Sequence, residues 1–261
     1  MRVEKLDALI VAGDLSNTFG NSMRDALAFL GRYLPADRLY VVPGNHDYYA
    51  ARLDDESPIR DLVRANGSWF AQKTELRHGN DRYLCATLWT DFELLGNRES
   101  AMRDARRSMR DYEMISTTAS DDATLEVDVI RPGRTSQITP QDTVARHREH
   151  RSWLEARLAE AHFAAGGRTF VITHHGPHPA AAGVMESLTP AFHSSLNEIF
   201  ETYDIDCWYF GHSHRRLSAE IAGTRGQNVS IGYPDEKHGR QEDDLEQVCF
   251  VSVPIGETRY D

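Results

Sequence analysis

The chain has 261 residues, enough to bury a sizeable core as one large domain or two small ones. Its 29 Lys and Arg against 40 Asp and Glu give a formal net charge of −11, which argues against a nucleic-acid-binding protein that relies on a basic surface. No apolar signal segment, bilayer-length apolar stretch or disulfide framework is visible, and a cytoplasmic protein without a membrane anchor is expected.

Strands and helices alternate over the first ninety residues. Apolar runs predict strands at residues 7–12 and 38–42, and short strands are expected at residues 74–77 and 82–88. Two segments with helical spacing of apolar residues lie between them, at residues 22–34 and 58–66. This β-α-β-α-β alternation indicates an α/β fold rather than an all-β domain.

Residues 90–139 interrupt the alternation and predict an insertion, or cap, over a site within one domain of residues 1–261. Helical spacing would place four arginines on one helix face: Arg103, Arg106, Arg107 and Arg110. Such a face could hold a substrate phosphate, although charge runs more commonly form a solvated helix side. The apolar residues at 125–130 would fit a strand.

The clearest helix begins at Thr139-Pro140, where Thr139 can cap and Pro140 suits the first turn, and it is expected to end at Gly166-Gly167. Further strands are predicted at residues 169–173, 207–210 and 247–253, with a hairpin of 216–221 and 227–231 around Gly223. A helix before the strand at 207–210 would present one apolar face, formed by Phe192, Leu196, Ile199 and Phe200.

Four of the predicted strands are followed at once by side chains that can bind metals. These segments are Gly13-Asp14, Gly44-Asn45-His46-Asp47, His174-His175-Gly176-Pro177 and Gly211-His212-Ser213-His214. Polar side chains at the carboxyl ends of strands meet at the mouth of a sheet, so we expect one metal centre there. The mixture of nitrogen and oxygen ligands suits Mn²⁺, Fe²⁺, Zn²⁺ or Ni²⁺, and the lack of cysteine ligands argues against a purely structural zinc site.

The residue types suggest individual roles at this centre. Asp14 offers oxygens that could bridge two metals, although a Gly-Asp after a strand is by itself a common turn. Asn45 offers an amide oxygen, and His174, His212 and His214 offer imidazole nitrogens; of the pair His174-His175 we favour His174 as the ligand. His46 need not bind metal and would act as a general acid or a charge clamp near the leaving group. Asp47 is expected to orient the loop or His46.

In this order, the four motifs resemble those of the calcineurin-like metallophosphoesterase superfamily, over about residues 7–235. Two segments, Thr139–Leu158 followed by the His pair and Cys207–His214, also resemble its small bacterial phosphoesterase branch. The resemblance implies a four-layer α/β/β/α sandwich of mixed sheets with a dinuclear metal centre. It implies hydrolysis of small phosphomonoesters or phosphodiesters by a metal-activated water. Carried over by motif, Asp14 would bridge both divalent metal ions, Asn45, His174 and His212 would hold one, His214 would hold the other, and His46 would be catalytic.

The chain departs from the family pattern at its beginning. The family opens with a strand ending in Asp-x-His, which supplies two ligands to the metal held by His214, and no Asp-x-His occurs in this sequence. One metal site therefore keeps its full ligand set and the other keeps Asp14 and His214. We expect an N-terminally truncated fold and a working protein that begins upstream of Met1. An in-frame stop codon just before Met1 would contradict this expectation.

Two functions of different classes follow from these residues. The first is a metal-dependent phosphoesterase, and the second is a catalytically weak or inactive scaffold on the same fold, motivated by the missing Asp-x-His. Retention of His46, which a scaffold does not need, favours the enzyme. A DNA exonuclease is disfavoured by the net charge of −11.

Overall fold

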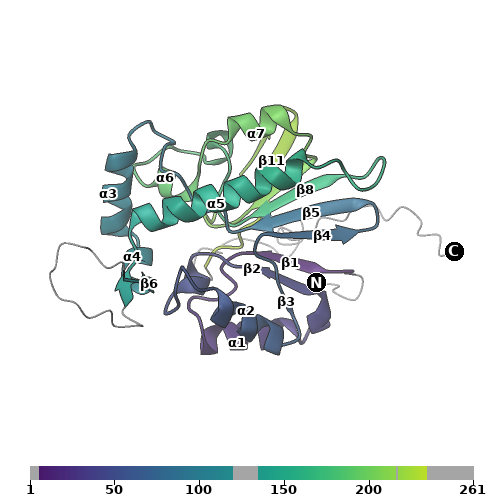
Figure 1. Ribbon diagram of the computed structural model, residues 1–261, viewed down its shortest axis with the longest axis horizontal. Coiled ribbons are helices and arrows are strands. Elements are labelled where there is room, and N and C mark those ends of the chain that lie inside the picture. The colour runs from purple at the N-terminus through teal and green to yellow at the C-terminus, as the bar shows by residue number, and fades with distance from the viewer. Residues whose placement is uncertain (1–5, 120–134, 216, 234–261) are drawn as a thin grey trace, which may run out of the picture.

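The computed structural model describes residues 6–119, 135–215 and 217–233, and its centre consists of two sheets that face each other (Figure 1). The smaller sheet has three parallel strands in the order β1 (Leu9–Ala12), β2 (Leu39–Val42), β3 (Trp69–Phe70). The larger sheet has six strands in the order β10 (Ser218–Ile221), β11 (Thr224–Asn228), β9 (Cys207–Phe210), β8 (Thr169–Thr173), β5 (Asp81–Ala86), β4 (Thr74–His78). Its four inner strands are parallel, and the edge strands β4 and β10 are antiparallel to their neighbours.

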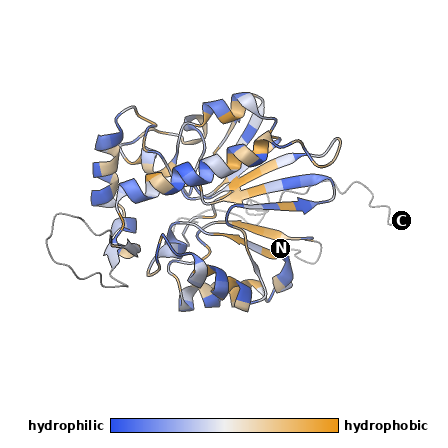
Figure 2. Ribbon diagram, viewed as in Figure 1, coloured by the Kyte–Doolittle hydropathy of each residue, from blue (hydrophilic) through white to orange (hydrophobic). Residues whose placement is uncertain are grey.

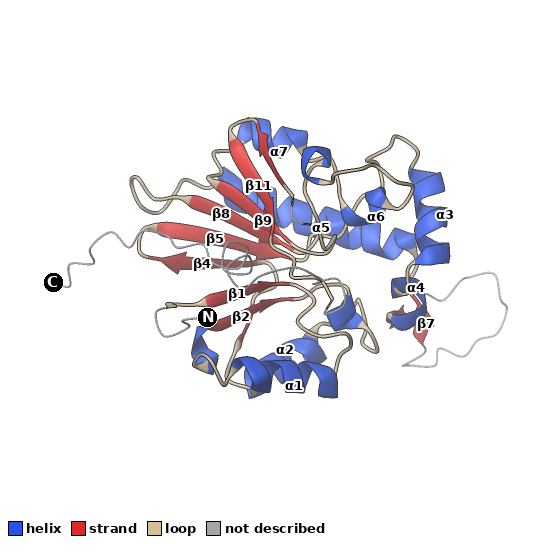
Figure 3. Cartoon of the chain, turned by 180° about the vertical axis from the view of Figure 1, so that it is seen from behind, coloured by secondary structure: helices blue, strands red, loops and turns tan. Residues whose placement is uncertain are grey.

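Helices cover the outer face of each sheet. The smaller sheet carries α1 (Asn21–Leu30) and α2 (Ser57–Ala65), and the larger carries α5 (Pro140–Ala159) and α7 (Asn197–Thr202) (Figure 1; reverse view in Figure 3). The strands between them are the most hydrophobic part of the ribbon (Figure 2). This arrangement confirms the predicted α/β fold with four α/β/β/α layers.

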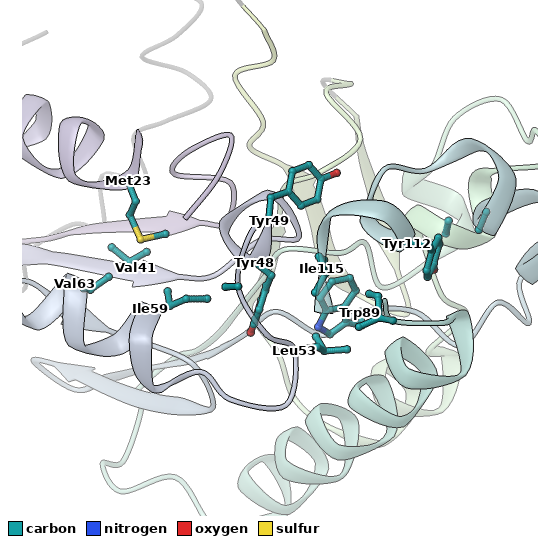
Figure 4. Close-up of a cluster of buried hydrophobic side chains, with 14 of the residues drawn as sticks. Met23, Val41, Tyr48, Tyr49, Leu53, Ile59, Val63, Trp89, Tyr112 and Ile115 are labelled. Atoms are coloured by element: carbon teal, nitrogen blue, oxygen red, sulfur yellow. The ribbon is translucent and has the colours of Figure 1, made fainter. Parts of the chain in front are cut away.

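Three apolar clusters hold the layers together. Between the two sheets, Val42 of β2 and Ile172 of β8 belong to one cluster. A second cluster joins the smaller sheet to α1 and α2 through Met23, Val41 and Val63 and continues to Trp89 (Figure 4). The third joins α5 and α7 to the larger sheet. Burial of these side chains is the main free energy that fixes the strand ends relative to one another.

The segment 90–139 contains α3 (Arg98–Ser108), α4 (Asp111–Met114), β6 (Ser116–Thr118) and β7 (Thr135–Gln137), and β6 pairs with β7. The prediction that Arg110 shares a helix face with Arg103, Arg106 and Arg107 is wrong. Helix α3 stops because Met109 is extended, and Arg110 starts the turn of α4. The predicted strands at 125–130 and 247–253 lie outside the described residues.

Helix α5 begins as predicted, with a reciprocal capping box between Thr139 and Asp142. It ends at Ala159, before the predicted Gly166-Gly167, because a side chain from β5 satisfies its last carbonyls. The guanidinium of Arg82 donates to the carbonyls of Arg157 and Glu160 at 3.2 and 3.1 Å. Carbonyls at the end of the helix are therefore satisfied by a residue 75 positions away from Arg157 in the sequence.

The predicted helix face of Phe192, Leu196, Ile199 and Phe200 is divided between α6 (Thr189–Phe192) and α7. The chain between them is extended because Ser194 and Leu196 donate their backbone N–H groups to the carbonyls of Gly176 and Pro177. The prediction of one continuous helix was wrong. Through these two hydrogen bonds, the segment between α6 and α7 is tied to the loop after β8.

The hairpin of β10 and β11 turns at Ala222-Gly223, so its second strand starts at Thr224 and not at the predicted 227. Both turn residues have positive φ, which suits a two-residue turn between twisted strands. Short 3-10 turns complete the described chain, at η2 (Ala36–Arg38), η3 (His46–Tyr48) and η4 (Pro179–Ala181). None of the helices in the described ranges has the length and apolar character needed to cross a bilayer.

Candidate metal centre

Gly13 and Asp14 turn the chain sharply where β1 ends. Both have positive φ, 88° and 53°, so the extended backbone of the strand stops there. A Cβ on Gly13 would lie 2.0 Å from Nδ1 of His174, so only glycine admits that imidazole. The left-handed backbone at Asp14 is a strained conformation of the kind that functional sites retain.

The loop after β2 is tied to the loop after β1 by the buried carboxylate of Asp47. It accepts hydrogen bonds from the backbone N–H groups of Leu15, Ser16 and Gly44 at 3.3, 3.0 and 2.9 Å. Burial raises the pKa of Asp47 to about 7, and these hydrogen bonds oppose the rise. Asp47 therefore orients the loops, the role expected from the sequence.

Asn45 and Asp14 meet His174 at the carboxyl ends of β2, β1 and β8. Nε2 of His174 lies 2.9 Å from Oδ1 of Asn45 and 3.4 Å from Oδ1 of Asp14. Its other nitrogen, Nδ1, lies 2.9 Å from the carbonyl oxygen of Ala12, which can only accept, so Nδ1 carries the proton. The lone pair of Nε2 consequently faces two oxygen atoms.

His175 occupies a different environment from its neighbour. Its Nδ1 lies 3.2 Å from the carbonyl oxygen of Thr87, and its backbone N–H donates to the same oxygen. The ring packs 4.5 Å from that of His212, measured between ring centroids. His175 thus packs against the ring of His212, whereas His174 contacts Asn45 and Asp14.

His212 follows Gly211 at the end of β9 and has a left-handed backbone, with φ of 67°. Phe192 stacks on its ring at 4.4 Å, and the ring is buried. Within the described ranges, Nε2 of His212 is buried without a hydrogen-bond partner. A buried nitrogen of this kind is costly unless it binds something that the protein chain does not supply.

The donors of this centre fit a divalent cation. Asp14, His174 and His212 each offer a ligand atom, and these atoms all lie within 4.8 Å of one another. A cation between them would take the lone pair of His174 that now faces oxygens and could take the orphan nitrogen of His212. With Asn45 they form a mixed oxygen and nitrogen set that suits borderline divalent ions.

Burial keeps the imidazoles neutral, the form that binds metals. Desolvation lowers the pKa of His174 to about 4 and the pKa of His212 well below its usual value. Desolvation also raises the pKa of Asp14 to about 6, against the opposing charge of His46. A bound cation would favour the ionised carboxylate of Asp14 and would offset that cost.

His46 lies beside the cluster without joining it. Its backbone N–H donates to Oδ1 of Asp14 at 3.0 Å, and its half-buried ring stacks on Tyr49 with centroids 4.5 Å apart. Burial lowers the pKa of His46, the Asp14 carboxylate opposes that shift, and the positive charge of Arg110 adds to it. The imidazole therefore borders the group formed by Asp14, His174 and His212 and is not one of its members.

His214 lies outside the group of three formed by Asp14, His174 and His212. Its backbone is left-handed, with φ of 49°, and Tyr233 meets its ring edge-on at 4.7 Å. The two histidines of Gly211-His212-Ser213-His214 therefore point to different surroundings. His212 is buried among other imidazoles, whereas His214 is partly exposed beside an aromatic ring.

One residue near the centre was missed by the sequence reading. Asp111 of α4 accepts hydrogen bonds at Oδ1 from Nδ2 of Asn45, at 2.8 Å, and from the hydroxyl of Tyr49, at 2.7 Å. The carboxylate is 2% exposed, and burial raises its pKa. No motif marks Asp111, since it lies in the segment that interrupts the alternation of strands and helices.

The chain resembles known proteins in sequence and in fold. An uncharacterized protein of Acanthamoeba polyphaga mimivirus, L509, is 23% identical over 248 residues, which is 88% of this chain and 80% of the viral protein. The crystal structure of phosphopantetheinyl hydrolase from Mycobacterium tuberculosis matches with a TM-score of 0.63 at 20% identity, covering 93% of this chain and 87% of that one. At such identity the structural likeness shows the shared fold alone.

The family model of calcineurin-like phosphoesterases matches residues 2–216, which include all four motifs that end in metal-binding side chains. That match agrees with the two facing sheets and with the cluster of Asp14, His174 and His212. The chain belongs to the calcineurin-like phosphoesterase family and is a metal-dependent hydrolase that acts on phosphoester bonds.

Proposed function

We propose that this protein hydrolyses phosphomonoesters or phosphodiesters at a divalent cation bound by Asp14, Asn45, His174 and His212. The observation that carries the proposal is the lone pair of His174 Nε2, which faces the oxygens of Asn45 and Asp14 at 2.9 and 3.4 Å. Three electron-rich atoms without a shared proton repel one another unless a cation lies between them.

When bound, a divalent cation polarises a phosphoryl oxygen and lowers the pKa of a water to about 7. The residues of the chain hold and orient the reacting groups around it. Asp14 and Asn45 are fixed by the backbone N–H of His46 and by Asp111, so their oxygens stay aimed at one point. Such pre-organised ligands need no rearrangement during the reaction.

His46 is proposed to donate a proton to the departing oxygen or to clamp its charge. The stacking of its ring on Tyr49 fixes the imidazole, and the residue stays partly exposed to solvent. A positioned general acid contributes about 10²–10⁴-fold to a rate. His214 is proposed to bind a second cation of a dinuclear centre, bridged to the first by Asp14.

The segment 90–139 is proposed to be a cap inserted into a single domain of residues 1–261. Its helix α4 reaches the centre through Asp111, and the charge of Arg110 acts on His46. These contacts support the proposal that the cap lies over the metal centre, where the substrate would bind.

A panel of phosphate esters tests the proposed function. We expect the purified protein with Mn²⁺ to hydrolyse members of a panel of aryl phosphates, alkyl phosphomonoesters, and cyclic and linear phosphodiesters. A phosphopantetheinylated substrate belongs in the panel, because the Mycobacterium tuberculosis protein of the same fold is a phosphopantetheinyl hydrolase. Asp14→Asn and His46→Ala should each lower kcat/KM by at least about 100-fold, since one removes a ligand charge and the other the proton donor.

His78→Ala is the matched control, because His78 is an exposed histidine on β4, 58% accessible at its side chain. Its activity should equal that of the unchanged protein. Full activity of the Asp14 or His46 variant would contradict the proposal. Cation binding without hydrolysis of any ester in the panel would favour a scaffold role instead.

A further inference from the structure

The side-chain amide of Asn45 can serve a cation in only one of its two orientations. Its oxygen and nitrogen ends have nearly the same shape, but only the oxygen can bind a metal ion. In the structure Oδ1 lies 2.9 Å from Nε2 of His174, and Nδ2 donates to Oδ1 of Asp111. Something must select this orientation over the reverse.

The surroundings of Oδ1 do not select it in the absence of a cation. Nε2 of His174 carries a lone pair, because Nδ1 donates to the carbonyl of Ala12. A reversed amide would donate an N–H to that lone pair, and it would also place a donor near the Asp14 carboxylate. On this side alone, the cation-free protein would favour the orientation that cannot bind metal.

The orientation of the Asn45 amide is selected at its opposite end. Nδ2 of Asn45 donates to Oδ1 of Asp111 at 2.8 Å, and a reversed amide would set two acceptor oxygens against each other at that distance. The hydroxyl of Tyr49 donates to the same oxygen at 2.7 Å and keeps it in place. A hydrogen bond to a buried carboxylate is stronger than one to the neutral imidazole.

Helix α4 holds Asp111 rigidly. The residue after it, Tyr112, and the residue after the helix, Ile115, belong to the same apolar cluster as Tyr49 (Figure 4). Asp111 itself is 2% exposed. The carboxylate is therefore shielded from solvent and held by the hydrogen bonds from Asn45 and Tyr49.

We propose that Asp111 is a positioning residue that locks the Asn45 amide with its oxygen toward the cation before the cation binds. The inference rests on the proposed function, since it takes Asn45 as a ligand. In this way the cap segment acts at the centre, because Asp111 of α4 orients Asn45, which lies 66 positions away in the sequence. Asp111 needs no contact with substrate for this role.

Cation affinity of the metal-free protein tests the proposal. We expect Asp111→Asn to bind Mn²⁺ about 10–100-fold more weakly than the unchanged protein in isothermal titration, the usual size for losing an outer hydrogen-bond partner of a ligand. Asp81→Asn is the matched control. Asp81 is also a buried carboxylate that accepts side-chain and backbone hydrogen bonds, from Arg168, but it lies at the amino end of β5, away from the centre.

A second variant of the protein separates the effect of the Asn45 amide orientation from the effect of the Asp111 charge. In Asn45→Asp the ligand is a carboxylate, which has no wrong orientation. Adding Asp111→Asn to that variant should therefore cause no loss of Mn²⁺ affinity. If Asp111→Asn causes an equal loss in the unchanged protein and in the Asn45→Asp variant, Asp111 acts through its negative charge alone, and the proposal fails.

Nuclear magnetic resonance of the unchanged, cation-free protein checks the orientation without relying on a variant that has to fold. Side-chain amide protons of Asn45 should show Overhauser contacts to the ring of Tyr49 and not to the ring of His174. The reverse pattern, or an unchanged affinity of Asp111→Asn, overturns the proposal. If Asn45→Ala binds Mn²⁺ like the unchanged protein, the proposed ligand set itself is at fault, which is a separate outcome.

Discussion

Gly44 determines how closely the loop after β2 can approach Asp14. A Cβ at this position would lie 2.2 Å from Oδ1 of Asp14 and 2.7 Å from Cε1 of His174, distances that no side-chain carbon tolerates. The backbone of Gly44 itself is not left-handed, so the need for glycine is one of space and not of φ. The close approach of this loop to Asp14 and His174 therefore requires a residue without a side chain at this position.

Gly44→Ala should therefore push Asn45 and Asp14 apart. We expect the free energy of unfolding to fall by about 1–3 kcal/mol, the usual cost of overpacking, and Mn²⁺ binding to be lost. Gly31→Ala is the control, because a Cβ there would approach no atom closer than 3.4 Å and Gly31 has an ordinary helical backbone. Chemical denaturation and metal titration measure both effects. Undiminished Mn²⁺ binding by Gly44→Ala would contradict the close approach.

At the scale of elements, the end of α5 depends on a charged side chain from β5. The buried guanidinium of Arg82 donates to Thr169 on β8 and to the carbonyls of Arg157 and Glu160, so it joins a helix to two strands. Burial lowers the pKa of Arg82, yet the guanidinium keeps its charge at neutral pH. One side chain thus satisfies carbonyls that a helix end otherwise leaves unpaired.

Arg82→Met should release the last turn of α5. We expect a loss of about 2–4 kcal/mol in the free energy of unfolding, because Thr169 and two carbonyls lose a charged donor. Hydrogen exchange should become faster in residues 155–160 and stay slow near Thr139, where the capping box is intact. Arg103→Met, at a side chain that is 60% exposed, should change neither. Uniform exchange rates in Arg82→Met would contradict this account of where α5 ends.

For the molecule as a whole, buried neutral histidines make stability depend on pH. His150 of α5 is 1% exposed, and its Nδ1 accepts the backbone N–H of Leu88 at 3.1 Å. Desolvation lowers the pKa of His150 to about 3. Since the unfolded chain takes up this proton near pH 6.5 and the folded chain does not, stability is lost as the pH falls below about 6.5.

His150→Gln places a neutral amide at this position and removes the titration. We expect the unchanged protein to lose about 2 kcal/mol more than this variant between pH 7 and pH 5, measured by urea denaturation at each pH. Arg148→Gln, at an exposed position on the same helix, is the control, since an arginine does not titrate in this range. Equal losses in His150→Gln and the unchanged protein would show that His150 does not contribute.

Local patterns in the sequence determined the strands that carry the site, the start of α5 and the side chains that follow these strands. Apolar runs placed β1, β2, β8 and β9, and Thr139-Pro140 placed the start of α5, because each depends on residues close in the chain. Asp14, Asn45, His174 and His212 were identifiable because parallel strands deliver their carboxyl ends to one edge. Their roles as ligands, and those of His46 and His214, remain proposals.

Long-range contacts decided what local patterns could not. The end of α5 depends on Arg82, and the division between α6 and α7 depends on carbonyls of the loop after β8. The orientation of Asn45 depends on Asp111, which no spacing rule connects to it. A hydrogen bond between residues far apart in the chain leaves no periodic trace in the sequence, so only the tertiary structure shows how this metal centre is held.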